Sequence, residues 1–598
     1  MKSHSSFSIE KPWVVTLLAL VFFVPYLGGV HLFDWDEINF AESAREMLVT
    51  KNYLRVQIDY QPFWEKPPLF IWIQALSMKI FGVNEFAARF PNAIVGVITL
   101  LTFYFVGKRL IDARFGFLWV LAYLGSVTPH LYFKSGIIDP LFNYFMFLSV
   151  LYLTPSLRST PLLGKERGTP KEGVRFFLAG IFAGLAVWTK GPVGVGVPTL
   201  TLGAFWLINY FQSKSVAKSS DCLSYYSFKN LSIYALTAGL LTAGWMLAII
   251  WESGWATFVA FLEYLYRLGA TSEADHGQPF YYHFIVVLIG CFPISVIGLP
   301  YVSRIFNPLL RKIGKSSNGI INPSQSAFRI TNPEQRSFIL MMLCLFWVVM
   351  IVFSIVKTKI VHYSSMTYFP LSFLAALWIH RWLKGEIVWP RWMTVLLLII
   401  GFILSLVLTA VPLIGMYSAI IAPYIDDTFV VANLQAPVEW AGYEWLFGVI
   451  YFGAIVYAAV LWQKRKLLAV RTLFFATAIL LFVYGAVVVP KIEGYTQRTV
   501  IDFYISKRGQ DVYVWPIGFK SYAQLFYFKK PIGVRAEASD EGWLLNGPVD
   551  KPTFLISRVD RAEEFRKHPN LELIKEENGF VFFRRKPDYQ KISESMTK

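Results

Sequence analysis

The sequence PWVVTLLALVFFVPYLGGVHLFDWDE, residues 12–37, joins a long uncharged apolar run to a pair of acidic residues. A run of about 20 apolar residues is long enough to cross the hydrocarbon core of a bilayer. Asp36 and Glu37 therefore lie where the chain leaves the hydrocarbon. Because a charge close to hydrocarbon costs roughly 2.5–3.5 kcal/mol, we expect these acids to pair, to bind a ligand or to take part in chemistry.

Composition extends this pattern to the whole chain. Hydrophobic residues make up 55% of the 598 residues, and the mean hydropathy is +0.48, well above the values of a soluble domain. The formal charge of +17 is spread over short loops between apolar runs, as in membrane proteins whose orientation follows their positive loops. The sequence therefore indicates an all-α polytopic membrane protein and argues against nucleic-acid binding.

Thirteen apolar runs are candidates for transmembrane helices. The segment Leu69–Phe81 is apolar but short, so we expect an interfacial helix there. With the N-terminus in the cytoplasm, this count places most loop Lys and Arg residues inside and the chain after Val489 outside. The expected spans are 12–30, 88–110, 115–133, 139–155, 175–190, 192–210, 231–251, 283–303, 337–356, 363–382, 391–415, 444–462 and 471–489.

This topology brings scattered polar residues to one side of the membrane. Two long loops, 31–87 and 252–282, lie outside together with the ends of several spans. We therefore expect one outward-facing site that these loops cover. The residues concerned are Asp36, Glu37, Glu65, Lys66, Asp139, Glu263, Arg267, His276, Lys357 and Tyr363.

The composition changes after the last span. Short strand-like runs alternate there with polar helical stretches, a pattern typical of a small α/β domain. We expect a transmembrane catalytic domain at 1–490 and an extracytoplasmic α/β domain at 491–598. The expected strands are 512–515, 553–556 and 580–583, and the expected helices are 521–528 and 561–567.

Two acids at helix starts have both a structural and a chemical interpretation. Asp36 precedes the helical stretch 41–47, where an N-cap and the helix dipole favour acids. A single cap does not need the three acids Asp34, Asp36 and Glu37, so the pattern favours an active-site carboxylate. Asp139, followed by Pro140, is equally well a cap or a second catalytic carboxylate.

Lysines supply the candidate contacts to an anion. In Glu65-Lys66-Pro67-Pro68 the prolines keep the backbone extended, so that the two charged side chains diverge. Lys66 then suits a phosphate as a point charge, with snorkelling toward lipid headgroups as the alternative. Lys190, in Lys-Gly-Pro, is part of a reversing turn or a further anion contact.

Metal and nucleotide chemistry receive little support from the residues alone. Glu65 and His276 would give two ligands, short of the three protein ligands usual for catalytic zinc. The chain has no HExxH, Walker loop or GxGxxG motif, so we expect no nucleotide cofactor.

Several motifs follow one another along the chain: Asp-Glu-x-x-x-Ala-Glu-x-x-Arg-Glu-Met at 36–47, Glu-Lys-Pro-Pro at 65–68 with Trp72, and Phe-Gly-x₆-Arg-x-Pro at 81–91. Together they resemble the bacterial branch of the protein O-mannosyltransferase superfamily, and within it most closely the lipid A aminoarabinose transferases. The likeness covers nearly the whole chain. The chain departs from the family at residues 359–363, where Lys-Ile-Val-His-Tyr replaces the expected Leu-Pro-x-Tyr.

The resemblance implies a GT-C fold and inverting transfer of a sugar from a polyprenyl-phosphate donor. It implies an inner-membrane enzyme whose site and C-terminal domain face the periplasm, with lipid A, a glycan or a protein as the acceptor. By position it makes Asp36 the catalytic carboxylate and Asp139 a second essential acid. It also implies that Lys66, Arg267 and Tyr363 contact the phosphate of the donor. Glu65 and His276 would hold a divalent ion such as zinc.

A secondary transporter or flippase of a lipid-linked sugar is the alternative. Such a protein also has many spans and buried charges, but its site is usually built from paired broken helices at the bilayer midplane. The expected gathering of charges at one face favours the enzyme.

Overall fold

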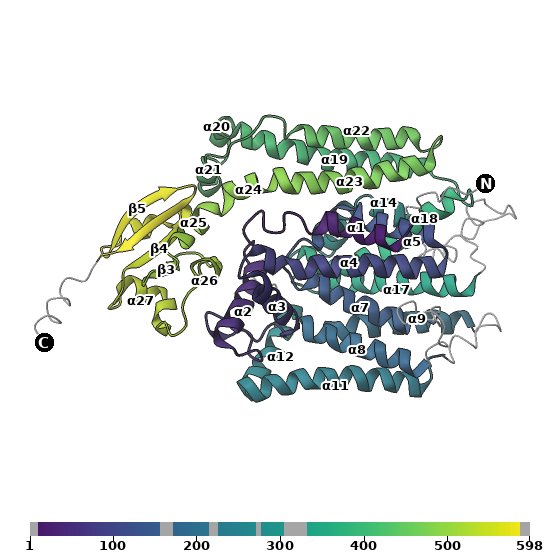
Figure 1. Ribbon diagram of the computed structural model, residues 1–598, viewed down its shortest axis with the longest axis horizontal. Coiled ribbons are helices and arrows are strands. Elements are labelled where there is room, and N and C mark those ends of the chain that lie inside the picture. Colours follow the sequence, from purple (N-terminus) through teal and green to yellow (C-terminus); the bar gives the residue numbers. More distant parts are fainter. Residues whose placement is uncertain (1–9, 156–171, 214–224, 271–276, 304–331, 587–598) are drawn as a thin grey trace, which may run out of the picture.

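The computed structural model describes residues 10–155, 172–213, 225–270, 277–303 and 332–586. It is a bundle of roughly parallel and antiparallel helices with a small mixed sheet beyond one end (Figure 1). Seven of the described helices are long and apolar enough to cross a membrane. They are α4 (Glu85–Leu110), α8 (Glu172–Lys190), α9 (Val193–Ser213), α11 (Phe228–Ser253), α17 (Pro333–Ile355), α19 (Arg391–Met416) and α23 (Lys466–Val487).

The other six expected spans coincide with shorter or interrupted helices. Prolines explain one interruption, because the expected span 283–303 divides at Pro293 into two short helices. The multi-span membrane character is clear, whereas the number thirteen stays a prediction. The helices concerned are α1 (Pro12–Phe23), α5 (Ala113–Leu124) with α6 (Val127–Tyr132), α7 (Asp139–Leu153), α13 (Tyr282–Gly290) with α14 (Ile294–Val302), α18 (Tyr368–Leu383) and α22 (Leu446–Leu461).

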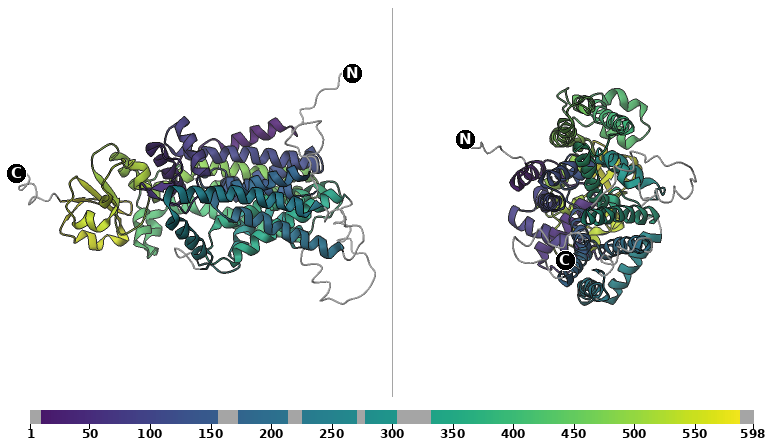
Figure 2. Two further views of the ribbon diagram at one scale, coloured as in Figure 1. Left: turned by 90° about the horizontal axis from the view of Figure 1, so that it is seen from below. Right: turned by 90° about the vertical axis from the view of Figure 1, so that its right-hand side faces the viewer.

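Two layers make up the bundle. In Figure 2 the helices α19, α22 and α23 form a group at one side of the remaining helices. Aromatic packing fills the larger group, where Phe103 stacks on Trp119 with ring centroids 4.5 Å apart and Phe147 meets Phe103 edge-on. Such pairs add about 0.5–1.5 kcal/mol each beyond the burial of their area.

Shorter elements gather at the end of the bundle that carries the sheet (Figure 1). The first outer loop holds α2 (Asp36–Thr50), a two-stranded hairpin of β1 (Gln57–Ile58) and β2 (Gln61–Pro62), and the expected interfacial helix α3 (Leu69–Phe81). The second outer loop holds α12 (Trp255–Ala270). Before α18 the chain forms a short 3-10 helix, η4 (Val361–Thr367).

The C-terminal region agrees in outline with the expected α/β domain. Its sheet has the order β3-β4-β6-β5, with β3 parallel to β4 and the other pairs antiparallel. Strand β5 was not expected, because its polar sequence lacks an alternating apolar pattern. The elements of this region are β3 (Tyr513–Pro516), β4 (Thr553–Arg558), β5 (Leu571–Glu577), β6 (Phe580–Arg585), α24 (Val489–Thr496), α25 (Arg498–Ser506), α26 (Ala523–Phe528), η6 (Ala536–Ser539), α27 (Glu541–Asn546), η7 (Val559–Arg561) and α28 (Glu563–Arg566). Three short elements precede this region, in the connection from α19 to α22: α20 (Ser418–Ile421), η5 (Ala422–Tyr424) and α21 (Thr428–Asn433).

The two faces of the sheet pack against different hydrophobic clusters, because successive residues of a strand point to opposite faces. Ile556 and Phe582 belong to the main hydrophobic cluster, whereas their neighbours Leu555 and Phe583 belong to a separate cluster on the other face. Polar contacts add to this, because Ser521 Oγ donates a 2.5 Å hydrogen bond to Asp34. The C-terminal sheet and the loop 31–87 therefore lie at the same end of the helix bundle.

Candidate active site

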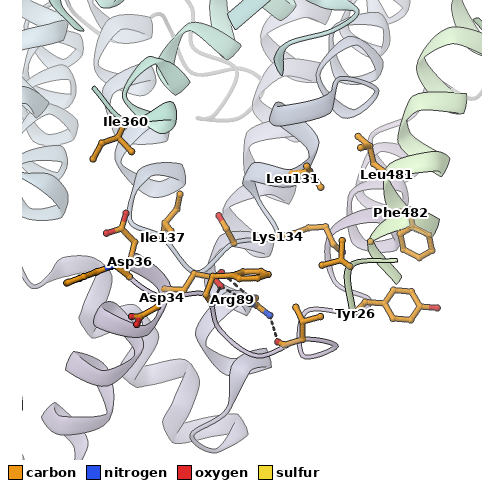
Figure 3. Close-up of a pocket in the computed structure, with 17 residues that line it drawn as sticks. Tyr26, Asp34, Asp36, Arg89, Leu131, Lys134, Ile137, Ile360, Leu481 and Phe482 are labelled. Atoms are coloured by element: carbon orange, nitrogen blue, oxygen red, sulfur yellow. Dashed lines mark hydrogen bonds and ion pairs between the residues drawn. The ribbon is translucent and has the colours of Figure 1, made fainter. Parts of the chain in front are cut away.

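Asp36 lies at the first turn of α2, in the wall of a cavity of about 520 Å³. Neither Asp34 nor Asp36 caps α2, because no side chain forms a capping hydrogen bond at the start of this helix. Asp34 instead accepts hydrogen bonds from Ser521 and the Tyr522 N–H. In Figure 3 the Asp36 carboxylate points toward Ile360 and the Asp34 carboxylate points the other way. The carboxylate of Asp36 is thus left for other partners.

Glu37 borders the same cavity but already has several protein partners. Its oxygens accept hydrogen bonds from Arg89 at 2.7 and 3.0 Å, from the Phe33 N–H and from the Gly136 N–H. Burial alone would raise the pKa of Glu37, but Arg89 and the two backbone donors lower it below its ordinary value. Arg89 also donates to the carbonyl of Val30, so the pair fixes the loop that carries Asp36.

A second cavity, of about 190 Å³, brings together residues from five distant segments. Lys190 at the end of α8 donates a 2.5 Å hydrogen bond to Asp139 at the start of α7. The Lys190 ammonium also lies over the ring of Tyr363, 5.2 Å from its centroid. The cavity is lined by Glu65, Lys66, Asp139, Phe142, Asn143, Met146, Lys190, Val193, Tyr264, Leu265, Phe353, Val356, His362, Tyr363 and Met366.

Lys66 is the cation of this cavity without a partner of its own. Among the described residues, no hydrogen bond or ion pair involves its ammonium group. Burial lowers the pKa of Lys66, and Lys190 lowers it further, against the opposite effect of the nearby carboxylates, of which Asp36 is the strongest. Because none of these carboxylates contacts the ammonium directly among the described residues, this buried cation can still bind an anion.

His362 of η4 lies at the junction between the two acids. Its Nε2 atom is 3.8 Å from an Asp36 oxygen and 3.9 Å from an Asp139 oxygen. His362 was not among the residues expected at the site, although the sequence Lys-Ile-Val-His-Tyr at 359–363, which differs from the expected Leu-Pro-x-Tyr, pointed to this segment. The structure thus links Asp36, which borders the larger cavity, to the smaller cavity through an imidazole ring.

Four expected site residues are not placed in this arrangement. Glu263 and Arg267 on α12, and Lys357 after α17, are exposed and do not border either described cavity. His276 lies outside the described residues. The expected metal site is not confirmed, because no group of three or more His, Cys, Asp or Glu residues that could hold a metal ion occurs in the described ranges.

Comparisons with known proteins agree with this picture. A family model for dolichyl-phosphate-mannose-protein mannosyltransferases matches residues 65–228. An undecaprenyl phosphate-alpha-4-amino-4-deoxy-L-arabinose arabinosyl transferase from Pectobacterium carotovorum is 24% identical over 96% of this chain and 97% of its own length. The resemblance to this superfamily is confirmed.

Other similar proteins match over different shares of their length. The transferase of the same name from Edwardsiella ictaluri is 26% identical over 47% of this chain, and the chain spans about half, 48%, of that relative. Among solved structures, ArnT from Cupriavidus metallidurans bound to undecaprenyl phosphate gives a TM-score of 0.69 at 15% identity, covering 96% of this chain and 97% of that chain. This match shows that the present chain has the GT-C fold.

Proposed function

We propose that this protein is an inverting membrane glycosyltransferase that uses a sugar linked to a polyprenyl phosphate. The relatives named above are undecaprenyl phosphate aminoarabinose transferases, so undecaprenyl-phosphate 4-amino-4-deoxy-L-arabinose is the first donor to test. Lipid A, which carries phosphate groups, is the first acceptor. The observation that carries the proposal is the ammonium of Lys66, which has no ion-pair partner among the described residues, in the cavity that also holds the Lys190–Asp139 pair.

The smaller cavity suits the donor phosphate. Lys66 would contact a phosphate oxygen directly, since its charge has no partner among the described residues. Lys190 contributes a second positive charge, which Asp139 holds in place at 2.5 Å. Phosphate leaves as an anion and needs no acid, so two ammonium groups stabilise the charge that develops on the leaving group.

The larger cavity suits the acceptor. Its wall combines charged side chains with apolar ones, such as Leu481 and Phe482, which would suit an amphipathic lipid. Asp36 borders it and also lies 3.8 Å from His362 of the donor cavity. An acceptor oxygen held by Asp36 would therefore approach the sugar from the side opposite the phosphate.

Transfer then follows as a single displacement at the anomeric carbon. The acceptor oxygen forms the new bond to this carbon as the bond to the phosphate oxygen breaks, and the electron pair goes to the phosphate. With a hydroxyl acceptor, Asp36 accepts the proton as a general base; with a phosphate acceptor there is no proton to remove, and Asp36 orients the sugar. No step is assigned to a metal ion or a nucleotide.

We infer the location from the topology. The contact between Asp34 and Ser521 supports a shared side for the site and the sheet domain, and the positive loops favour the periplasm for that side. The protein would then act at the outer face of the bacterial inner membrane, where the donor and lipid A can both be reached from the bilayer.

The transporter alternative has no support from the comparisons. A transporter would move the lipid-linked sugar without a covalent change. We would therefore incubate the purified protein with undecaprenyl-phosphate aminoarabinose and lipid A and weigh the lipids by mass spectrometry. The proposal predicts that lipid A gains the mass of one aminoarabinose residue. If neither lipid A nor any other candidate acceptor gains this mass, the proposal is contradicted.

A further inference from the structure

Asp36 has a single polar neighbour in ion-pair range among the described residues, the imidazole of His362. Asp139, in contrast, is already bound by Lys190 at 2.5 Å. The same His362 nitrogen lies 3.9 Å from Asp139. The ring is therefore the one described group that bridges the carboxylate proposed for the acceptor and the carboxylate that holds the donor-side lysine.

The backbone that carries His362 is held firmly. Its carbonyl oxygen accepts a 2.5 Å hydrogen bond from Ser365 Oγ. Ser365 in turn accepts from Asn143 Nδ2 of α7 at 2.8 Å and is hydrogen-bonded to the Tyr132 hydroxyl at 2.8 Å. This buried network joins η4 to the helix that begins at Asp139, so that the ring has a fixed base.

The charges that act most strongly on the ring balance when it is neutral and no ligand is bound. Two carboxylates, Asp36 and Asp139, face two ammonium groups, Lys66 and Lys190. A bound phosphate adds further negative charge at short range. Because a like charge in a desolvated site is unfavourable, an additional positive charge becomes more favourable once the phosphate is bound.

We infer that His362 is a positioning residue: its ring holds the Asp36 carboxylate at the junction of the two cavities and takes up a proton when the phosphate of the donor binds. This inference rests on the proposed function and extends it to a residue that was not expected at the site from the sequence. The proton comes from solvent and returns there when the polyprenyl phosphate leaves. The sugar transfer itself neither forms nor breaks a bond to His362.

The electrostatics of the free site agree with this role. Burial lowers the pKa of His362, Asp139 and Asp36 raise it, and Lys190 and Lys66 lower it, with a net shift below the ordinary value. The free site thus leaves the ring neutral near pH 7, and the phosphate shifts it toward the charged form. The titratable and charged groups around it are Asp36 of α2, Glu65 and Lys66 before α3, Asp139 of α7, Lys190 of α8, Tyr264 of α12, His283 of α13, and Lys359 and Tyr363 beside or on η4.

The test compares His362→Gln and His362→Ala over a range of pH. The Gln side chain keeps a neutral N–H donor but cannot titrate, whereas Ala removes both contacts. We expect His362→Ala to lower kcat at least tenfold with KM for the donor changed less than threefold, and His362→Gln to restore most of that kcat. His568→Gln, in the sheet domain and remote from both described cavities, is the matched control.

Binding of undecaprenyl phosphate gives a readout that does not depend on transfer. In the wild type we expect affinity to fall as pH rises through the pKa that His362 has in the complex, and in His362→Gln we expect this limb to be absent. Measurement in a Lys66→Arg background removes the titration of Lys66 from the same profile. An unchanged pH profile in His362→Gln would overturn the inference even if the enzyme transfers sugar. A lost limb together with no transfer by the wild type would instead contradict the proposed function alone.

Discussion

The Nζ atom of Lys190 lies 2.5 Å from Oδ1 of Asp139, and this pair joins the end of one helix to the start of another at the wall of the donor cavity. The pair is shielded from water, since the Asp139 side chain is only 4% exposed. A shielded charge pair is far more sensitive to the loss of one partner than a surface pair.

Asp139→Asn should therefore reduce transfer strongly. Loss of a hydrogen bond between charged groups costs about 1.5–3 kcal/mol, which corresponds to roughly a 10- to 150-fold lower kcat/KM if the pair places Lys190 on the donor phosphate. The control is Asp511→Asn, because the Lys551–Asp511 pair is largely exposed and contributes little. Equal kinetics for Asp139→Asn and wild type would remove Asp139 from the site.

Lys66→Ala should weaken the binding of the donor and so raise its KM. Lys66→Arg should keep part of the wild-type affinity for the donor, because the positive charge remains. Lys79→Ala is the control, since Lys79 is an exposed lysine of the interfacial helix α3. Titration gives a further signature. Because the pKa of Lys66 is lowered, donor binding should weaken as pH rises through that pKa, at a lower pH than for an ordinary lysine. Donor kinetics of Lys66→Ala equal to those of Lys79→Ala would indicate snorkelling instead.

Glu37→Gln should damage stability more than it damages chemistry. The substitution leaves the buried Arg89 without its charge partner, a change that costs about 3–5 kcal/mol in buried pairs. We expect a clearly lower Tm in detergent for Glu37→Gln and an unchanged Tm for Asp36→Asn. A stable Glu37→Gln protein with a selectively raised KM would assign Glu37 to substrate binding.

Topology can be tested without any substrate. A reporter fused after Val489 should be active only in the periplasm, because an odd number of spans starting in the cytoplasm ends outside. A cytoplasmic reporter at this position would mean that the number of spans is even, and it would place the candidate site on the cytoplasmic face with the sheet domain.

Short sequence patterns predicted the positions of most helices and of several residues that border the two cavities. Apolar runs predicted the positions of the helices, and the motifs at 36–37 and 65–68 pointed to residues that do border the two cavities. Asp139 and Tyr363 were also found from the sequence, and both border the smaller cavity. The positions of these residues could be predicted because each depends on a short stretch of chain or on its distance from the hydrocarbon; their roles stay predictions.

Contacts between distant segments could not be predicted in the same way. Asp34 was only one of three acids at the start of the expected helix, yet it accepts a hydrogen bond from Ser521, which lies 487 positions later. His362 carries no motif of its own, and its role depends on the folding of η4 against α2 and α7. Likewise, the pairing of Glu37 with Arg89 is invisible to a reading of either motif alone.

The central claim is that Asp36 acts in glycosyl transfer. Asp36→Asn keeps the size and polarity of the side chain but removes its charge, and the side chain caps no helix in the structure. The decisive measurement is the rate at which purified Asp36→Asn moves aminoarabinose from undecaprenyl phosphate to lipid A, alongside its affinity for undecaprenyl phosphate and the exposed control Asp426→Asn. We predict transfer below detection with donor-lipid binding within about threefold of wild type, a split expected for loss of a transition-state interaction. Wild-type transfer by Asp36→Asn would contradict the account.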